Sequence, residues 1–133
     1  MRVVFDTNIL VSALVLPGGR AAEALARVVE GRDHLVLSKP ILDELLGVLA
    51  RKFSRDREEL ARVAVWLDEL ADWVRPTRRL SVAADEADNR ILECASAGRA
   101  DAIVTRDRAL LQLRNFEGIQ TLALRDYLAV EDN

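Results

Sequence analysis

The chain has 133 residues, a length that suits one compact domain, 1–133, and leaves little room for a second. Half of the residues are hydrophobic, which excludes wholesale disorder, and the formal charge of -3 argues against a protein with a basic surface throughout. The single cysteine, Cys94, excludes a disulfide within the chain, and no apolar run is long enough to span a membrane. We therefore expect a soluble cytoplasmic protein.

Short apolar runs alternate along the chain with longer stretches of helical spacing. In the first half of the chain they predict a strand at 3–5, helices at 8–14 and 20–30, a strand at 34–37, and a helix from the N-cap Ser38 to about Phe53. A helix at 57–70, a weak strand at 73–74 and a loop at 76–84 follow. The last predicted elements are a helix at 86–97, a strand at 102–105, a helix at 108–113 and a strand at 119–124. Nearly continuous apolar strands separated by helices are typical of a parallel sheet covered on both faces.

In such an open α/β sandwich, ligands gather outside the carboxyl ends of the strands. Two predicted strands lead into an acid at that end: Asp6 follows the first strand, and Asp107 follows the strand at 102–105. If the two strands are neighbours, both carboxylates face one crevice. Each acid also suits the N-cap of the helix that follows it, and for either residue taken alone the two interpretations are equally good.

A third acid, Glu44, borders the apolar stripe of its predicted helix. Ile41 and Leu45 belong to that stripe, and Glu44 lies three residues after one and directly before the other. A carboxylate on this margin can reach a crevice while its helix packs on the sheet. Taken alone, Glu44 is more typical of a solvated helix edge than of a functional site.

A fourth acid, Asp88, lies four residues before Leu92 and points toward the apolar side of its helix. A buried carboxylate needs a partner, and a cation is one solution. The alternative is that Asp88, or Asp85 before it, only caps the helix, and we assign Asp85 to capping. Asp101, before the strand at 102–105, either supports the metal ligands or only forms a turn, and we favour the turn.

Four converging carboxylates without Cys or His ligands favour a hard divalent ion, Mg²⁺ or Mn²⁺. Zinc is disfavoured, because the single His34 lies in a strand-like run and Cys94 suits core packing. The chemistry that needs such a site is phosphoryl transfer, in which the metal activates a water and stabilises the leaving oxygen.

Four segments together resemble the PIN-domain family, and most of all its VapC-like toxins from bacterial toxin–antitoxin systems. They are V-V-F-D-T-N-I-L-V-S-A-L, L-D-E-L, D-N-R-I-L-E-C-A and A-D-A-I-V-T-R-D-R-A-L. The resemblance covers essentially the whole chain. It implies a three-layer α/β/α sandwich with a parallel sheet of about five strands, metal-dependent cleavage of RNA, a homodimer and inhibition by a cognate antitoxin.

The same resemblance assigns roles to individual residues. The family's acidic quartet, which is catalytic and binds the metal, is matched by Asp6, Glu44, Asp88 and Asp107. Its polar supporting positions are matched by Asn8 and Thr105. The chain departs from the family at Leu110-Leu111, where a Phe often follows the last acid, and we interpret this as a difference in packing.

Arg106 and Arg108 flank Asp107 and are the candidates to hold a substrate phosphate. Two further basic clusters, 51–57 and 75–79, are more typical of a solvated surface. Few aromatic residues are available to stack bases, and we interpret Trp66 and Trp73 as core or dimer contacts.

Three rival interpretations remain at this point. An aspartate-based phosphatase needs a second acid two residues after the first, and Asn8 occupies that position. A receiver-like phosphorylation module needs paired acids near the end of the first strand and a lysine after a late strand, where Thr105 stands. A PIN-like scaffold that binds RNA or a partner without cutting is compatible with every residue of the sequence.

Overall fold

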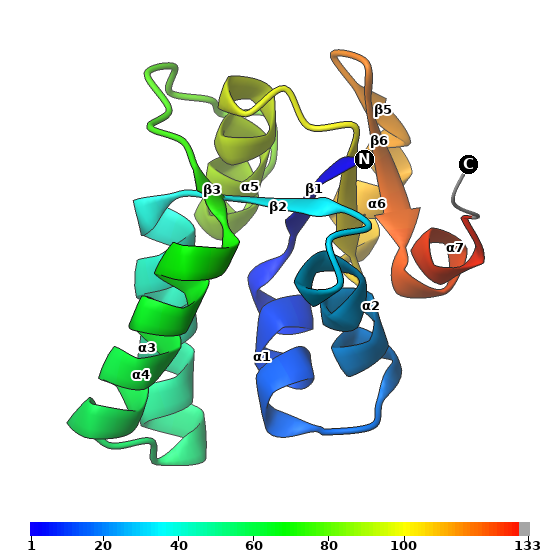
Figure 1. Cartoon of the computed structure of the whole chain (residues 1–133). Coiled ribbons are helices and arrows are strands. Elements are labelled where there is room, and N and C mark those ends of the chain that lie inside the picture. The colour runs from blue at the N-terminus through cyan, green and yellow to red at the C-terminus, as the bar shows by residue number, and fades with distance from the viewer. Residues whose placement is uncertain (131–133) are drawn as a thin grey trace.

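The computed structural model describes residues 1–130, which form a central sheet with helices on both faces (Figure 1). The strands are β1 (Arg2–Phe5), β2 (His34–Leu37), β3 (Asp72–Trp73), β4 (Ala102–Thr105), β5 (Asn115–Phe116) and β6 (Ile119–Ala123). The helices are α1 (Thr7–Val15), α2 (Arg20–Val29), α3 (Lys39–Phe53), α4 (Arg57–Leu70), α5 (Glu86–Ala97), α6 (Arg108–Leu113) and α7 (Leu124–Ala129).

The sheet has the order β3-β2-β1-β4-β6-β5, and its first five members are parallel. The parallel strands confirm the expected α/β architecture, and the weak strand at 73–74 is present one residue earlier. From β1 the chain first adds β2 and β3 on one side of the sheet and then returns to add β4, β6 and β5 on the other side, so the strand order changes direction between β1 and β4. This is a topological switch point, where the carboxyl ends of parallel strands leave room for a ligand.

Two elements were missing from the sequence prediction. β5 pairs antiparallel with β6 through a turn at Glu117-Gly118, where φ is 53° and 88°. Positive φ at both central residues is the geometry of a tight hairpin, and a two-residue strand is too short to show periodicity. The other missed element is α7, whose six residues we had joined in part to the preceding strand.

The helices divide between the two faces of the sheet, which gives the expected three layers (Figure 1). α1 and α2 cover one face together with α7, which packs on α2. α5 crosses the other face and contacts β1, β2 and β4. The α3–α4 pair extends beside α1, so that α3 begins at the carboxyl end of β2 and passes close to the switch point.

The core lies between these layers and is built by the apolar residues that the sequence pattern predicts. Val3, Val4 and Phe5 of β1 are fully buried, as are Ile103 and Val104 of β4. Trp66 and Trp73 remain 38% and 37% exposed, so the core interpretation of these two residues was wrong.

Gly98 ends α5, as predicted, but not through a left-handed conformation. Its φ is -87°, and a Cβ placed on it would collide with the Val36 side chain of β2. The absence of a side chain therefore lets the end of α5 lie directly on the sheet. This close approach helps to fix the axis of the helix that carries Asp88.

Within residues 1–130, no single helix is long and apolar enough to cross a membrane. α1 and α2 pass that test only as a pair, and they meet at an angle of 95°.

Candidate functional site

Asp6 and Asp107 lie side by side at the carboxyl edge of the sheet, because β1 and β4 are neighbours. The backbone N–H of Asp6 donates to the carbonyl oxygen of Val104 (2.9 Å), which continues the ladder between the strands. The hydroxyl of Thr105, fully buried, donates to Oδ2 of Asp6 (2.6 Å) and accepts from the backbone N–H of Asp107 (2.9 Å). Thr105 therefore orients both acids through its hydroxyl.

The capping alternatives have different outcomes for these two acids. Asp6 occupies the N-cap position of α1, but its side chain makes no capping hydrogen bond and is only 7% exposed. Asp107 does cap α6, since its Oδ1 accepts from the backbone N–H of Leu110 (3.0 Å). Capping uses one oxygen of Asp107 and leaves the carboxylate at the same edge of the sheet as Asp6.

Burial raises the pKa of Asp6 above its usual range, and the negative charge of Asp107 acts in the same direction. The hydrogen bond from Thr105 and the nearby backbone N–H groups of Asn8 and Thr7 oppose this rise. The pKa of Asp6 is raised on balance, so its surroundings stabilise the charged carboxylate less well than water does.

Asp88 belongs to the first turn of α5 and is 5% exposed, in agreement with its predicted inward direction. Burial is the main reason that its pKa rises to about 7, followed by the negative charges of Asp107, Asp6 and Asp85 and a hydrogen bond with Asp107. A carboxyl group that shares a hydrogen bond with another carboxylate is stabilised in its protonated form. A proton or a cation at Asp88 therefore compensates the negative charges around it.

Glu44 reaches the same region from α3. Its helix buries Ile41 and Leu45 as predicted, while Glu44 itself is half-buried. Burial raises the pKa of Glu44, and the charges of Asp6 and Asp85 add to that rise. The buried Thr7 hydroxyl lies near enough to oppose the rise but has no partner in good hydrogen-bond geometry.

These contacts define a carboxylate cluster of four acids from four different elements: Asp6, Glu44, Asp88 and Asp107. A fifth acid at its edge was underestimated from the sequence. Asp85 caps α5 by accepting from the backbone N–H of Ala87 (2.8 Å), as expected, but its charge also raises the pKa of Glu44 and Asp88. Its position three residues before Asp88, on the same side of the helix, was the signal for this role.

The other predicted polar residues have varied placements. Asn8 is exposed, and only its backbone N–H acts on Asp6. Arg106 is exposed beside the cluster and donates to the hydroxyl of Ser12 (3.0 Å), whereas Arg108 begins α6 with an exposed side chain. Asp101 accepts from the backbone N–H of Arg2 (2.8 Å) at the opposite edge of the sheet, which agrees with a turn residue.

The donor set of the carboxylate cluster fits a hard divalent cation. Among residues 1–130, Asp6, Asp88 and Asp107 form no ion pair with a basic side chain. Instead, the charge of Asp107 raises the pKa of Asp6, and both charges raise the pKa of Asp88. No three acids, His or Cys within that range are already close enough together to bind one ion. Binding would therefore require the carboxylates to draw together and Asp88 to lose its proton.

A zinc site receives no support from the described residues. His34 begins β2 at the amino edge of the sheet, far along the strand from the carboxylate cluster. Cys94 is fully buried in α5, and burial raises the pKa of its thiol to about 12. Both placements agree with the sequence interpretation.

Comparison with known proteins decides the family. Residues 2–109 match the family model described as PIN domain, which includes all four acids of the carboxylate cluster. The chain belongs to the PIN domain family. PIN domains are in general nucleases that use divalent metals, which agrees with the donor set at the carboxyl edge of the sheet.

Similar proteins extend this assignment over most of the chain. An uncharacterised protein of Methanocaldococcus jannaschii, MJ1680, is 28% identical over 119 residues, which is 86% of this chain and 76% of that protein. The structure is similar to chains in two crystal structures of VapBC complexes. One is VapBC-1 from nontypeable Haemophilus influenzae, with a TM-score of 0.65, 18% identity, and 94% of this chain and 99% of that chain covered.

The other is VapBC2 from Rickettsia felis, solved with a DNA fragment from the promoter, with a TM-score of 0.64 and 15% identity. The match covers 92% of this chain and 98% of that chain. At such identities the likeness shows the fold, and the fold is the three-layer PIN architecture predicted above.

Proposed function

We propose that this PIN domain is a metal-dependent ribonuclease that hydrolyses phosphodiester bonds in RNA. The observation that carries the proposal is the carboxylate cluster itself: four acids, two at the carboxyl ends of β1 and β4 and two on α3 and α5, in which the charges of Asp6 and Asp107 raise the pKa of neighbouring acids. A fold rarely retains such unbalanced charge for stability alone, and perturbed carboxylates of this kind gather at catalytic sites.

In this proposal Asp6, Glu44, Asp88 and Asp107 hold Mg²⁺ or Mn²⁺. When bound, the metal lowers the pKa of a water and stabilises the leaving oxygen of the phosphodiester. Thr105 keeps Asp6 and Asp107 in place through its two hydrogen bonds. Any one of the four carboxylates could also take the proton of the attacking water.

Attack by water predicts the products of the reaction. The attacking oxygen comes from solvent, so the 2′-hydroxyl of the RNA takes no part and the cut leaves a 5′-phosphate and a 3′-hydroxyl. Products that end in a 2′,3′-cyclic phosphate would exclude this mechanism, because they require attack by the 2′-hydroxyl.

The test is cleavage of a mixed pool of structured and single-stranded RNA with Mn²⁺, with EDTA and with the Asp6→Asn variant. We expect cutting only when both the metal and Asp6 are present. Asp43→Asn is the matched control, because Asp43 is an exposed acid next to Glu44 that pairs with Lys39 (2.9 Å). Cutting that persists in EDTA or in Asp6→Asn would contradict the proposed site.

We also propose that the protein is the toxin of a toxin–antitoxin pair, acting as a homodimer. The support is the similarity of its fold to chains of two VapBC complexes. Expression of the chain alone in a bacterial host is expected to stop growth, and co-expression of the neighbouring open reading frame is expected to restore it. Growth arrest that Asp6→Asn does not relieve would argue against toxicity through RNA cleavage.

A non-catalytic scaffold is the second candidate function. It is favoured by one observation, namely that the acids within residues 1–130 are not yet close enough to bind a single ion. A scaffold would bind RNA or a protein partner with no turnover and would show no heat of binding with Mn²⁺ in a calorimeter. The nuclease would show both turnover and metal binding.

A further inference from the structure

Glu44, Gly47 and Arg51 lie along one side of α3. They are separated by three and by four residues, and such neighbours lie above one another on a helix. The seven residues from Glu44 to Arg51 make about two helical turns, so both side chains belong to the same stripe of the helix. Since Glu44 is a member of the carboxylate cluster, this stripe leads from the cluster along the surface of α3.

The guanidinium group of Arg51 lies directly over Gly47. A Cβ placed on Gly47 would be 2.8 Å from Nη1, 3.5 Å from Cζ and 3.6 Å from Nη2 of Arg51, and outside the backbone of α3 these are its nearest neighbours. A side chain at position 47 would therefore push the guanidinium away. Long helical side chains point toward the start of their helix, and here that direction brings the charge of Arg51 back toward Glu44.

The backbone of α3 does not itself require a glycine at position 47. Within residues 1–130 the glycines with positive φ are Gly18, Gly31 and Gly118, whereas Gly47 is an ordinary residue in the interior of the helix. A glycine there makes the helix less stable than an alanine would. The space that α3 gains in return is occupied by the guanidinium of Arg51.

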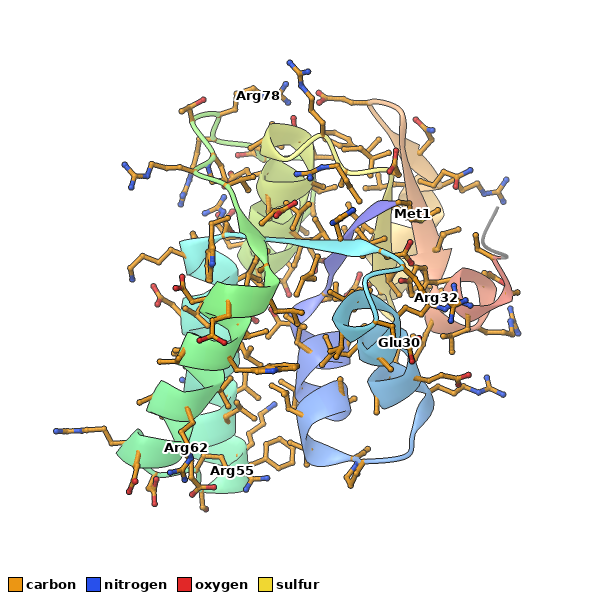
Figure 2. All side chains as sticks on the ribbon, in the orientation of Figure 1. Met1, Glu30, Arg32, Arg55, Arg62 and Arg78 are labelled. Carbon is orange, nitrogen blue, oxygen red and sulfur yellow. The ribbon has the colours of Figure 1, made fainter. Side chains whose placement is uncertain are left out.

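The charge of Arg51 is not balanced by an ion pair within residues 1–130, and its side chain is exposed. It acts on Glu44 nevertheless, because it opposes the rise in the pKa of that acid. Arg55 differs in both respects. It pairs with Glu59 (3.1 Å), and Figure 2 shows it at the far end of the α3–α4 pair.

A simpler role for Arg51 is stabilisation of the helix dipole, because it belongs to the last turn of α3. Lys52 lies in the same turn and is equally able to act in this way. The guanidinium of Arg51, however, lies over Gly47, one turn back from its own position and away from the last carbonyl groups of α3. The simpler role also leaves the glycine at position 47 without an explanation.

We propose that Arg51 binds a substrate phosphate beside the carboxylate cluster and that Gly47 is the positioning residue that holds its guanidinium there. The inference rests on the proposed ribonuclease and adds two residues to its substrate site. With the scissile phosphate over the carboxylate cluster, the guanidinium binds the neighbouring phosphate through charge-assisted hydrogen bonds. An unpaired cation at the border of an acidic site also reduces the repulsion that a phosphate meets there.

The experiment records RNA binding and RNA cleavage separately. Binding of a fluorescein-labelled, unstructured RNA of about twelve nucleotides is measured by fluorescence anisotropy in EDTA at several salt concentrations. Cleavage with Mn²⁺ gives kcat and KM, and thermal unfolding gives the Tm. The variants are Arg51→Gln, Arg51→Lys, Gly47→Ala and the double variant of Gly47→Ala with Arg51→Gln. Arg55→Gln is the matched control.

Arg51→Gln is expected to weaken RNA binding about tenfold and to raise KM by a similar factor with little change of kcat. One phosphate contact on a single strand contributes about 0.7 to the slope of log affinity against log salt concentration, so the slope should fall by that amount. Arg51→Lys should keep the slope, because the charge remains, and lose part of the affinity, because an ammonium group lacks the planar fork. Arg55→Gln should match the wild-type protein.

Gly47→Ala is expected to change stability and binding in opposite directions. The Tm should rise by about 3 °C, since alanine favours the helix, while RNA binding should weaken about threefold, since the new Cβ displaces the guanidinium. In the Arg51→Gln background the same substitution should raise the Tm and cause no further loss of binding. A residue that served only the fold would not show this dependence on Arg51.

Equal RNA affinity and KM in Arg51→Gln and Arg55→Gln would overturn the phosphate-binding role. A Gly47→Ala variant that binds RNA like the wild-type protein, or that weakens binding equally with and without Arg51, would overturn the positioning role. Failure of the ribonuclease proposal is a different result, namely no metal-dependent cutting by the wild-type protein. The expected binding changes without any cutting would assign Arg51 and Gly47 to RNA binding by a scaffold.

Discussion

Two regions of this molecule bury acidic side chains to the same degree with opposite electrostatic results. Asp33 lies just before β2, at the amino edge of the sheet, and is 5% exposed. Asp88, also 5% exposed, lies in the carboxylate cluster at the carboxyl edge. Burial raises the pKa in both regions, yet the final direction is downward for Asp33 and upward, to about 7, for Asp88.

The difference lies in the partners. Asp33 accepts hydrogen bonds from the amino group of Met1 (2.8 Å) and from the hydroxyl of Tyr127 (2.5 Å), and these outweigh the effect of burial on its pKa. Asp88 faces Asp107, Asp6 and Asp85 instead. An acid whose charge is balanced inside the chain serves the fold, whereas an acid surrounded by other acids needs a cation from outside.

The largest effect is expected for a substitution of Asp88 in α5, which should lower activity without lowering stability. Asp88→Asn should lower kcat/KM by roughly a hundredfold to a thousandfold, because one member of the carboxylate cluster is lost. In metal-free buffer the same variant should keep or raise the Tm, since a source of like-charge repulsion is removed. The measurements are RNA cleavage with Mn²⁺ and thermal unfolding in EDTA.

Glu93 provides the control for that variant, because it is an acid of α5 with the same 5% exposure. It pairs with Arg90 (2.9 Å) and accepts from the backbone N–H of Leu80 (2.8 Å). Glu93→Gln should therefore lower the Tm and leave kcat/KM of the folded protein unchanged. The comparison fails if Glu93→Gln and Asp88→Asn affect activity and stability in the same way.

The second prediction concerns pH in the absence of metal. The folded protein binds the proton of Asp88 more tightly than the unfolded chain does, so the folded state holds more protons between about pH 4 and pH 7. The free energy of unfolding should therefore fall as the pH rises through this window and level off above it. We expect a loss on the order of 2–4 kcal/mol, because the site is partly open to solvent.

Urea unfolding in EDTA at a series of pH values measures this effect, with Asp88→Asn as the reference. The variant should lose most of the slope between about pH 4 and pH 7, because it has no carboxyl group to titrate at that position. Parallel curves for the wild-type protein and the variant would show that another group is responsible.

The third prediction tests directly whether the folded protein binds a divalent metal ion. A metal that binds only the folded state stabilises it by about 2.7 kcal/mol when its concentration is a hundred times its dissociation constant. Titration with Mn²⁺ or Mg²⁺ should therefore raise the Tm of the wild-type protein. The gain should be largely absent in Asp6→Asn and retained in Asp43→Asn, and an unchanged Tm in the wild-type protein would exclude a site of useful affinity.

The smallest effect is expected at Asp33, whose charge is balanced by partners inside the chain. Asp33→Asn removes the charge that meets the Met1 amino group and the Tyr127 hydroxyl, and we expect a loss of about 2 kcal/mol in the free energy of unfolding. The response to Mn²⁺ and the value of kcat/KM should not change. A loss of activity in folded Asp33→Asn protein would mean that the two regions are coupled through the sheet.

Much of the fold was predictable because it depends on local patterns. The apolar runs of β1 and β4, with Asp6 directly after the first and Asp107 two residues after the second, predicted two parallel strands whose acids would share one crevice if the strands were neighbours. The inward direction of Asp88 was predictable from its apolar neighbours one helical turn away, whereas spacing alone favoured a solvated helix edge for Glu44. Sequence resemblance then placed all four acids in one family pattern, and the match to the PIN domain over residues 2–109 confirmed the family.

Other features depended on contacts between distant segments. The helix α7 is held by Arg27 of α2, whose guanidinium donates to the carbonyl oxygens of Leu128 (2.6 Å) and Tyr127 (3.2 Å) and lies over the ring of Tyr127. These partners are about 100 residues apart in the chain. No periodicity within six residues could have announced a helix that is stabilised in this way.

The sequence by itself determined the fold class, because the alternation of strands and helices follows from short-range spacing, whereas the choice of the four acids followed from the family resemblance. Only the tertiary structure decided which charges are balanced. The pKa of an acid depends on burial and on every charge within several ångströms, and those neighbours come from α3, α5 and two strands that meet only after folding.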